Sequence, residues 1–420
     1  MPPTSPDLPT GSAEQPPLPR NIWVMTAASF LTDVSSDMVN NLVPLFLANV
    51  LGTRTATIGL VEGVAESTSS LIKLLSGWWS DRVVSRKPPT VIGYTISALS
   101  KPLLGFASSS LAVLGIRFAD RLGKGIRTAP RDALLADSVP AQQRGRAFGL
   151  HRAGDSLGAA VGLVLALIIV WLSQGTAVKL DQMTFRRIAL ASALPGFLAV
   201  LVLIVGLTEV RREAPAAGKP ILGSFGALPT SFRHYLIILA VFTLGNSADA
   251  FIILRGQERG LSVVGVLLML IAFNLVYTSV AGPAGRLSDR IGRQRVIVAG
   301  WVVYAVIYLG LALATQAWQV VALFIAYGAY HGLVDAAERA LVADLSGADL
   351  RGSAYGIYHA TIGLIALPAS VLAGILWQGL GSWTGFGPAA PFLFGALSAL
   401  VAIVLFRWWL PQQVTADGSS

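Results

Sequence analysis

Long apolar segments recur along almost the whole chain, separated by short polar breaks. A helix needs about 20 apolar residues to cross the hydrocarbon core of a bilayer, and about twelve segments reach that length. Strands of a membrane β-barrel need only about ten residues of alternating pattern, whereas these segments are continuous. The pattern therefore predicts an all-α integral membrane protein with about twelve transmembrane helices. The expected spans are 22–50, 56–80, 90–109, 111–135, 146–172, 186–207, 233–254, 262–284, 294–314, 317–340, 352–377 and 387–409.

Composition supports a membrane environment. Of the 420 residues, 54% are hydrophobic and only 13% are charged, whereas a soluble protein carries about 25% charged residues. The net charge is +9, but the basic residues form short clusters between apolar segments, so they favour helix orientation over nucleic-acid binding. The chain has no Cys, which excludes disulfides and thiolate metal sites. No cofactor is expected.

The distribution of basic residues predicts the topology. Lys and Arg concentrate in cytoplasmic loops of membrane proteins, and the clusters here fall on one side if both termini are cytoplasmic. An even number of helices agrees with that topology. We expect a multi-pass protein of the plasma or inner membrane, present as a monomer. The residues assigned to the cytoplasmic side are Arg82, Arg86, Lys87, Arg144, Arg146, Arg211, Arg212, Lys219, Arg290, Arg293, Arg295 and Arg351.

The chain divides into two halves. Residues 1–20 are rich in proline and predict a disordered tail. Residues 208–232 form the longest polar break within the membrane region, with the Pro, Gly and charged residues typical of a linker. We therefore expect six-helix bundles at 21–207 and 233–410, followed by a tail at 411–420.

An internal repeat relates these halves. A shift of about 207 residues aligns Arg-Gly-Arg-Ala-Phe-Gly at 144–149 with Arg-Gly-Ser-Ala-Tyr-Gly at 351–356, and Asp137 with Asp344. Repeated loops at the same place in each half indicate duplication of a six-helix unit. In such folds the halves are related by an axis along the membrane normal, and solute sites lie between them.

One repeated loop carries a recognisable motif, Gly-x-x-x-Asp-Arg, followed by further basic residues. On these residues the chain resembles the major facilitator superfamily of secondary transporters, in the branch of drug and solute exporters, from residue 21 to residue 410. The first copy departs from the family pattern at Val84, where Gly is usual. The resemblance implies a cytoplasmic gate made of Gly77, Asp81, Arg82, Arg86, Gly285, Asp289, Arg290 and Arg293.

The gate has a physical rationale. Asp81 at a helix end can accept hydrogen bonds from a helix N-terminus of the opposite half, while Arg82 and Arg86 pair with nearby acids. Such contacts form a lock that exists in one conformation only. The alternative is that these loops only orient the helices, a role that needs no Asp.

A second family pattern, on the predicted fifth helix, marks antiporters. Gly149, Gly158 and Gly162 keep its spacing, but Leu163 replaces the usual Pro and the last two glycines are absent. The alternative interpretation is close helix packing through small residues.

Ionisable residues within the spans indicate where solute and protons pass, because such groups are costly at bilayer depth unless they face water or a partner. Asp33 and Asp37 share one helix face, as do Glu62 and Glu66 on the next helix. The alternative is that these acids form permanent ion pairs with basic residues of the fourth helix. The predicted pathway consists of Asp33, Asp37, Glu62, Glu66, Arg127, Arg152, Asn246, Asp249, His331 and Asp335.

These features favour a secondary transporter that works by alternating access and exchanges protons for a small organic compound or drug, in the direction of export. Divalent metal export is an alternative, since carboxylates and histidines suit such ions. An organic-anion carrier is another, because basic residues could hold a carboxylate or phosphate. A receptor or scaffold without transport activity is a fourth possibility. No motif of a catalytic site is present, so we expect no enzyme.

Overall fold

The computed structural model describes residues 17–80, 85–140, 143–210, 228–346 and 351–410, and within these ranges all regular structure is helical. Predictions for residues 1–16, 211–227 and 411–420 lie outside this part of the chain. The helices of the first half are α1 (Arg20–Val39), η1 (Asn40–Leu42), α2 (Val43–Leu45), η2 (Phe46–Val50), α3 (Thr55–Ser80), α4 (Lys87–Leu104), α5 (Ser110–Asp137), α6 (Arg144–Gln174), α7 (Gln182–Ala191) and α8 (Ala193–Gly206). Those of the second half are α9 (Thr230–Gly245), α10 (Ala250–Glu258), α11 (Val263–Ile291), α12 (Arg293–Leu313), α13 (Ala317–Ser346), α14 (Arg351–Gln378) and α15 (Ala390–Trp409).

These helices make twelve crossings, which confirms the predicted fold class. Segment α1–η2 forms the first crossing, α7–α8 the sixth and α9–α10 the seventh, and each remaining helix crosses once. By length and hydropathy alone, 8 crossings of the described chain could span a membrane. The other four, α1–η2, α3, α4 and α5, are the more polar ones, and they carry most of the charges predicted to lie at bilayer depth.

Three of the predicted spans are interrupted rather than continuous. The first changes from α-helix to a 3₁₀ turn at Asn40, and the sixth is interrupted at Ser192. The seventh unwinds over residues 246–249, where Asn246 leaves helical geometry with φ −89° and ψ 80°. Unwound backbone at membrane depth is tolerated only where protein or a water-filled cavity satisfies it.

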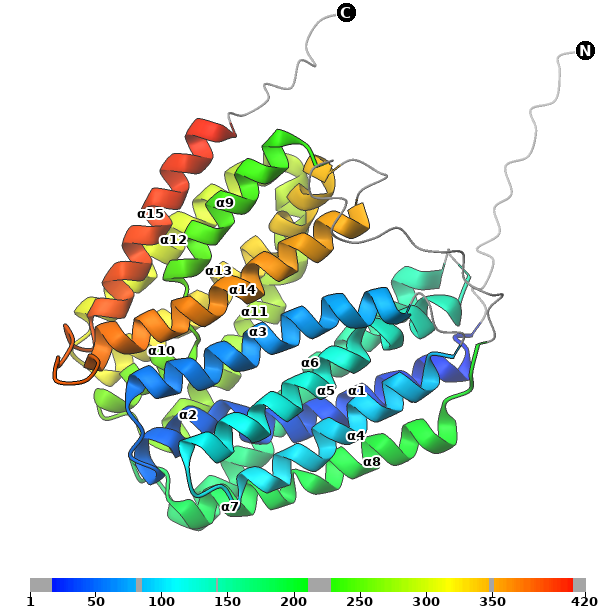
Figure 1. Ribbon diagram of the computed structural model, residues 1–420, viewed down its shortest axis with the longest axis horizontal. Helices are drawn as coiled ribbons and strands as arrows, with labels where there is room; N and C mark the ends of the chain where they lie inside the picture. The colour runs from blue at the N-terminus through cyan, green and yellow to red at the C-terminus, as the bar shows by residue number, and fades with distance from the viewer. Residues whose placement is uncertain (1–16, 81–84, 141–142, 211–227, 347–350, 411–420) are drawn as a thin grey trace, which may run out of the picture.

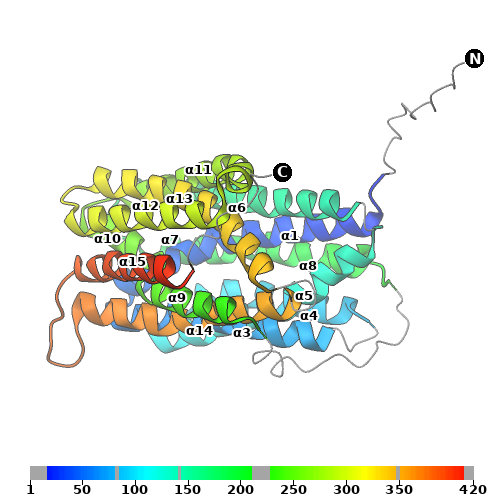
Figure 2. The same cartoon turned by 90° about the horizontal axis from the view of Figure 1, so that it is seen from above.

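Two helical bundles form the molecule, α1–α8 and α9–α15, and Figures 1 and 2 show their helices running in broadly the same direction. In both views α14 lies beside α3 and α11 lies beside α6, and these two helix pairs form most of the interface between the bundles. We call the end of the bundles that carries Arg20, Gly206, Thr230 and Trp409 the terminus face. The opposite end, at the left of Figure 1, is the far face.

At the far face the bundles are joined by hydrogen bonds. The Thr55 backbone N–H donates to Gln378 Oε1 (2.9 Å) and its hydroxyl donates to the Gly374 carbonyl (3.0 Å). The Val263 N–H donates to the Ala177 carbonyl at 3.2 Å. Further hydrogen bonds between the bundles lie at this face, from Gln257 to the Val178 carbonyl, and near mid-depth, from the Ser67 hydroxyl to the Gly363 carbonyl. The structure is therefore closed at the far face.

Glycine allows the close approach of α3 and α14 behind this closure. A Cβ added to Gly374 would lie 2.4 Å from the Thr55 carbonyl oxygen, and one added to Gly59 would lie 2.1 Å from the Ser370 carbonyl oxygen. Because both obstructing atoms belong to the backbone, no side chain can move aside to make room. Small residues that let helices approach closely are typical of helix–helix interfaces in membrane proteins.

We predict that Gly374→Ala weakens the closure at the far face by about 1–3 kcal/mol, the usual cost of overpacking. The chain has no Cys, so a single pair introduced as Thr55→Cys and Gln378→Cys reports on this contact through its disulfide cross-linking rate, which we expect to fall. Gly115→Ala is the matched control, because a Cβ there meets nothing within 4 Å. Equal cross-linking in both variants would contradict the prediction.

Candidate functional site

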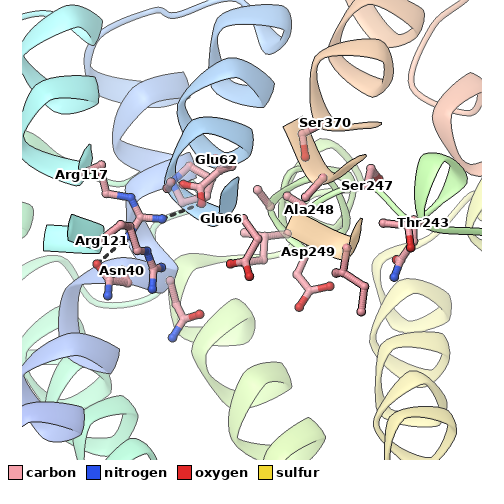
Figure 3. Close-up of a pocket in the computed structure, with 18 of the residues that line it drawn as sticks. Asn40, Glu62, Glu66, Arg117, Arg121, Thr243, Ser247, Ala248, Asp249 and Ser370 are labelled. Atoms are coloured by element: carbon pink, nitrogen blue, oxygen red, sulfur yellow. Dashed lines mark hydrogen bonds and ion pairs between the residues drawn. The ribbon is translucent and has the colours of Figure 1, made fainter. Parts of the chain in front are cut away.

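A cavity of about 420 Å³ lies between the two bundles. Three crossings of each bundle supply its walls, as the close-up in Figure 3 shows for the labelled residues. The lining residues are Asn40, Asn41, Pro44, Glu62, Ala65, Glu66, Arg117, Arg121, Thr243, Asn246, Ser247, Ala248, Asp249, Ala250, Ile253, Tyr327, His331, Ile362, Ala366 and Ser370.

The wall contributed by the first bundle is charged. Glu62 and Glu66 are one turn apart on α3, and Arg117 and Arg121 are one turn apart on α5, so each pair presents itself on one helix face. Asn40 joins them at the point where α1 becomes a 3₁₀ turn. Figure 3 shows the two arginines approaching the glutamates from the side of α5.

One of these arginines is already paired. Arg117 Nη2 lies 2.6 Å from Glu62 Oε2, and Arg117 Nη1 donates to Asn40 Oδ1 at 2.7 Å. The Arg117 side chain is only 2% exposed, so the pair closes a buried charge network. For Glu62 this geometry favours the interpretation as a permanent ion pair.

The wall contributed by the second bundle is polar but nearly uncharged, and it is built on the break between α9 and α10. Tyr308 and Tyr327 donate hydrogen bonds to Asn246 Oδ1, each at 3.3 Å. Tyr304 donates to the Gly245 carbonyl at 3.2 Å. Hydroxyls from α12 and α13 thus stabilise the unwound segment and leave Asp249 facing the cavity.

A side chamber of about 180 Å³ opens into the first bundle and shares Asn40, Asn41 and Arg121 with the main cavity. Asn41 Nδ2 donates to Asp37 Oδ1 at 3.0 Å. The Arg127 guanidinium lies over the ring of Tyr94, 4.2 Å from its centroid, a favourable cation–π geometry. The chamber is lined by Asp33, Ser36, Asp37, Asn40, Asn41, Ser97, Asp120, Arg121, Lys124 and Arg127.

The residues predicted for the pathway therefore divide into three groups. Glu62, Glu66, Asn246, Asp249 and His331 line the main cavity, and Asp33, Asp37 and Arg127 line the side chamber. Arg152 and Asp335 line neither.

Instead, Arg152 and Asp335 meet through Tyr277. Arg152 Nη2 donates to the Tyr277 hydroxyl (3.4 Å), which donates to Asp335 Oδ2 (3.2 Å). This chain of contacts joins α6 of one bundle to α11 and α13 of the other. His331 Nδ1 lies 3.6 Å from Asp335 Oδ1, so the Tyr277 bridge continues to the cavity.

The sequence analysis did not assign Arg117, Arg121 or Tyr327 to the site. The two arginines continue the polar stripe of α5, so their spacing of four residues could have placed them there. Tyr327 offered no such sequence pattern, because an aromatic residue in an apolar span usually packs in the hydrophobic core.

Part of the predicted gate is described. Arg86 Nη1 lies 2.6 Å from Asp137 Oδ2, and Arg293 forms the corresponding ion pair with Asp344. Both ion pairs lie at the terminus face and are related by the same shift of about 207 residues that aligns the halves. Asp81 and Arg82 lie outside the described residues. Gly77 belongs to α3, Gly285, Asp289 and Arg290 belong to α11, and of these only Arg290 has a described environment, which is exposed.

The glycines of the antiporter pattern do not share one environment. A Cβ added to Gly158 would lie 2.4 Å from the Phe30 carbonyl oxygen, and one added to Gly162 would lie 2.5 Å from that of Val34. These two positions allow α6 to pack closely against α1. A Cβ added to Gly149 meets nothing within 4 Å, so packing does not account for that glycine.

The described residues contain no group of three or more His, Asp or Glu side chains placed to hold a metal ion. His331 shares the main cavity with Glu62 and Glu66, whereas His359 lines neither the cavity nor the chamber. The geometry thus gives no support to the divalent-metal alternative.

We predict that Arg117→Ala destabilises the protein by about 3–5 kcal/mol, because it leaves Glu62 buried without its partner. Unfolding of the purified protein in detergent, followed by temperature or denaturant, measures the loss. The double variant Arg117→Met with Glu62→Gln removes both charges and should recover most of the stability. If the single and double variants were equally unstable, the ion pair would not be the cause.

Comparison with known proteins places this site in a family context. The sequence model of the Major Facilitator Superfamily matches residues 25–270 and 235–420. An uncharacterized MFS-type transporter of Methanocaldococcus jannaschii is 34% identical over 396 residues, covering 92% of this chain and 94% of the relative. A multidrug resistance efflux pump of Streptococcus pneumoniae is 23% identical, covering 71% of this chain and 74% of the pump.

The fold has solved counterparts as well. A crystal structure of a nucleoside transporter, NupG, superimposes with a TM-score of 0.76, covering 93% of this chain and 99% of that one, at 14% sequence identity. At this identity the likeness concerns the fold alone.

Proposed function

The chain belongs to the major facilitator superfamily, and we propose that it is a secondary transporter that exchanges protons for a small organic compound by alternating access to the cavity between its bundles. The observation that carries the proposal is the polar cavity itself, which lies at the interface of two halves that are joined by hydrogen bonds at the far face. Rocking of one bundle against the other would open the far face and close the terminus face. Solute binding would then alternate between the two sides of the membrane.

We infer that the terminus face is cytoplasmic. Arg86, Arg144, Arg293 and Arg295 lie at that end of the bundles, in agreement with the enrichment of basic residues in cytoplasmic loops. In the conformation described here the cavity would then be reached from the cytoplasm. This arrangement suits the loading step of an exporter. The partial antiporter pattern and the likeness to an efflux pump also support export.

Proton coupling is assigned to the side chamber. Asp33 lines this chamber together with two further acids, Asp37 and Asp120, and with the basic residues Lys124 and Arg127. Carboxylates gathered in one small chamber repel one another when all are ionised, so binding a proton relieves the repulsion. Arg121 lies on the wall that the chamber shares with the main cavity, so this residue links the charge of the chamber to solute binding.

An organic-anion carrier is the second candidate, supported by Arg121, Lys124 and Arg127. Only Arg121 of these three lines the main cavity, and Glu66 and Asp249 line it as well. A purely anionic solute would therefore meet more negative than positive unpaired charge in the main cavity.

The lock predicted for Asp81 remains part of the proposal for the gate.

We predict that Asp33→Asn abolishes coupling while solute still binds. Proteoliposomes holding a preset pH gradient are challenged in turn with organic cations, organic acids, lipophilic drugs and divalent metals. The wild type should dissipate the gradient for one class, and Asp33→Asn should slow this proton flux at least tenfold because its amide cannot carry the proton.

Asp181→Asn is the matched control. Asp181 lies in the far-face loop and caps α7 by accepting hydrogen bonds from the backbone N–H groups of Met183 (2.7 Å) and Thr184 (3.1 Å). Asn is an equally good cap, so this variant should retain wild-type flux. Unchanged flux in Asp33→Asn would remove the chamber from the coupling path, and no flux in the wild type for any class would defeat proton antiport.

A further inference from the structure

We propose that the solute of the main cavity is a small organic zwitterion whose anionic group binds Arg121 and whose cationic group binds Asp249. This inference rests on the transport function proposed above and names the class of its substrate. It follows from the charges that remain in the cavity once internal pairs are set aside.

Six acidic or basic side chains line the cavity, and they comprise three carboxylates, two arginines and one histidine. Glu62 and Arg117 neutralise each other across 2.6 Å. His331 faces Asp335, with 3.6 Å between Nδ1 and Oδ1. One guanidinium, on Arg121, and two carboxylates, on Glu66 and Asp249, are left to meet a solute.

Arg121 has the chemistry of an anion site. It lines both the main cavity and the side chamber, and no carboxylate of the described chain lies within 4.0 Å of its guanidinium nitrogens. A charged group at this depth is costly without a partner. The planar guanidinium suits a carboxylate or phosphate, which it can bind through two parallel hydrogen bonds. Arg121 therefore points to an anionic group on the solute.

Asp249 offers the opposite charge from the other bundle. It stands at the unwound segment just before α10, beside Tyr327 and His331, and it lies within 4.0 Å of no Lys or Arg nitrogen in the described residues. Figure 3 shows Arg121 and Asp249 on opposite sides of the cavity, with Glu66 between them. Because Asp249 lines the cavity, its carboxylate can accept hydrogen bonds from an ammonium group of the solute.

A zwitterion satisfies this arrangement better than a simple ion. An organic anion bound at Arg121 would face the unpaired carboxylates of Glu66 and Asp249, and an organic cation bound at Asp249 would leave Arg121 unsatisfied. A solute that carries both charges meets Arg121 and Asp249 with their complements. The volume of about 420 Å³ suits a small organic molecule, and Ile253 and Ile362 supply apolar surface for its body.

The arrangement also makes the solute bridge the bundles, since Arg121 belongs to the first and Asp249 to the second. The protein binds such a ligand more tightly in a conformation that brings the two walls close enough for both contacts than in one that holds them apart. Such a difference in affinity is what allows a ligand to shift a conformational equilibrium.

Binding of charge-matched triplets tests the proposal. The purified protein in detergent is titrated with phenylalanine, phenethylamine and 3-phenylpropionate, and separately with 4-aminobutanoate, butylamine and butanoate, with calorimetry and thermal shift as readouts. In at least one triplet the zwitterion should bind at least tenfold more tightly than either single ion. The proposal is overturned if an amine or acid binds as tightly as its zwitterion, or if no zwitterion of either triplet binds.

Two substitutions test which residue binds each end of the solute. Arg121→Gln should abolish the preference for the zwitterion over the amine while binding of the amine is retained, and Asp249→Asn should abolish the preference over the acid. Arg121→Lys keeps the charge but not the two-pronged geometry, and it should recover only part of the preference. Lys179→Gln and Asp181→Asn remove one charge of each sign from the exposed far-face loop and should bind all six compounds as the wild type does.

Uptake of the preferred zwitterion into proteoliposomes separates this inference from the proposed function. Binding with the expected dependence on Arg121 and Asp249 but without flux would keep the zwitterion site and reject transport. Flux of an organic ion without preference for a zwitterion would keep transport and reject the site. Circular dichroism and gel filtration of each variant identify any loss of folding.

Discussion

An ionised side chain at the depth of the hydrocarbon must face water or a partner, and this constraint organises the whole interior of the protein. In the first bundle it is met by ion pairs, with Lys101 3.9 Å from Asp120 and Arg117 2.6 Å from Glu62. In the second bundle it is met mainly by neutral donors. Glu338 accepts hydrogen bonds from the Trp301 indole (3.2 Å) and the Tyr358 hydroxyl (2.8 Å).

The two bundles consequently present different surfaces to the cavity between them. The first presents acids and guanidinium groups on regular helices, where Glu62 is paired with Arg117 while Arg121 has no ion-pair partner among the described residues. The second presents an unwound segment stabilised by tyrosine hydroxyls, with Asp249 as its unpaired charge. The two bundles are thus similar scaffolds with dissimilar walls. That difference permits a solute with two unlike ends to be bound in one orientation.

Much of the fold could be predicted from periodicity and loop chemistry, because membrane helices must satisfy their own backbone and so follow the hydropathy of the chain. The polar faces of the first and second crossings were also predictable, since residues four apart share a face. The pairing of Arg117 with Glu62 was not, because it depends on how far α3 and α5 are rotated toward each other. The break at residues 246–249 was missed for another reason: the run Gly-Asn-Ser-Ala-Asp at 245–249 has turn chemistry, but it lies inside a span whose average hydropathy is high.

The contacts that join the bundles differ in kind from those that hold each bundle together. Within the bundles at the terminus face, Arg86 pairs with Asp137 and Arg293 pairs with Asp344, so each half has its own ion pair there. Across the far face the described contacts are hydrogen bonds to backbone carbonyls or a side-chain amide and glycine-mediated packing, as at Thr55 and Gly374. A neutral hydrogen bond contributes only about 0.5–1.5 kcal/mol, whereas breaking a buried ion pair inside a bundle, such as Arg117 with Glu62, costs about 3–5 kcal/mol. Motion between states should therefore separate the bundles at their interface and leave each bundle intact, because the weakest contacts lie where alternating access requires the structure to part.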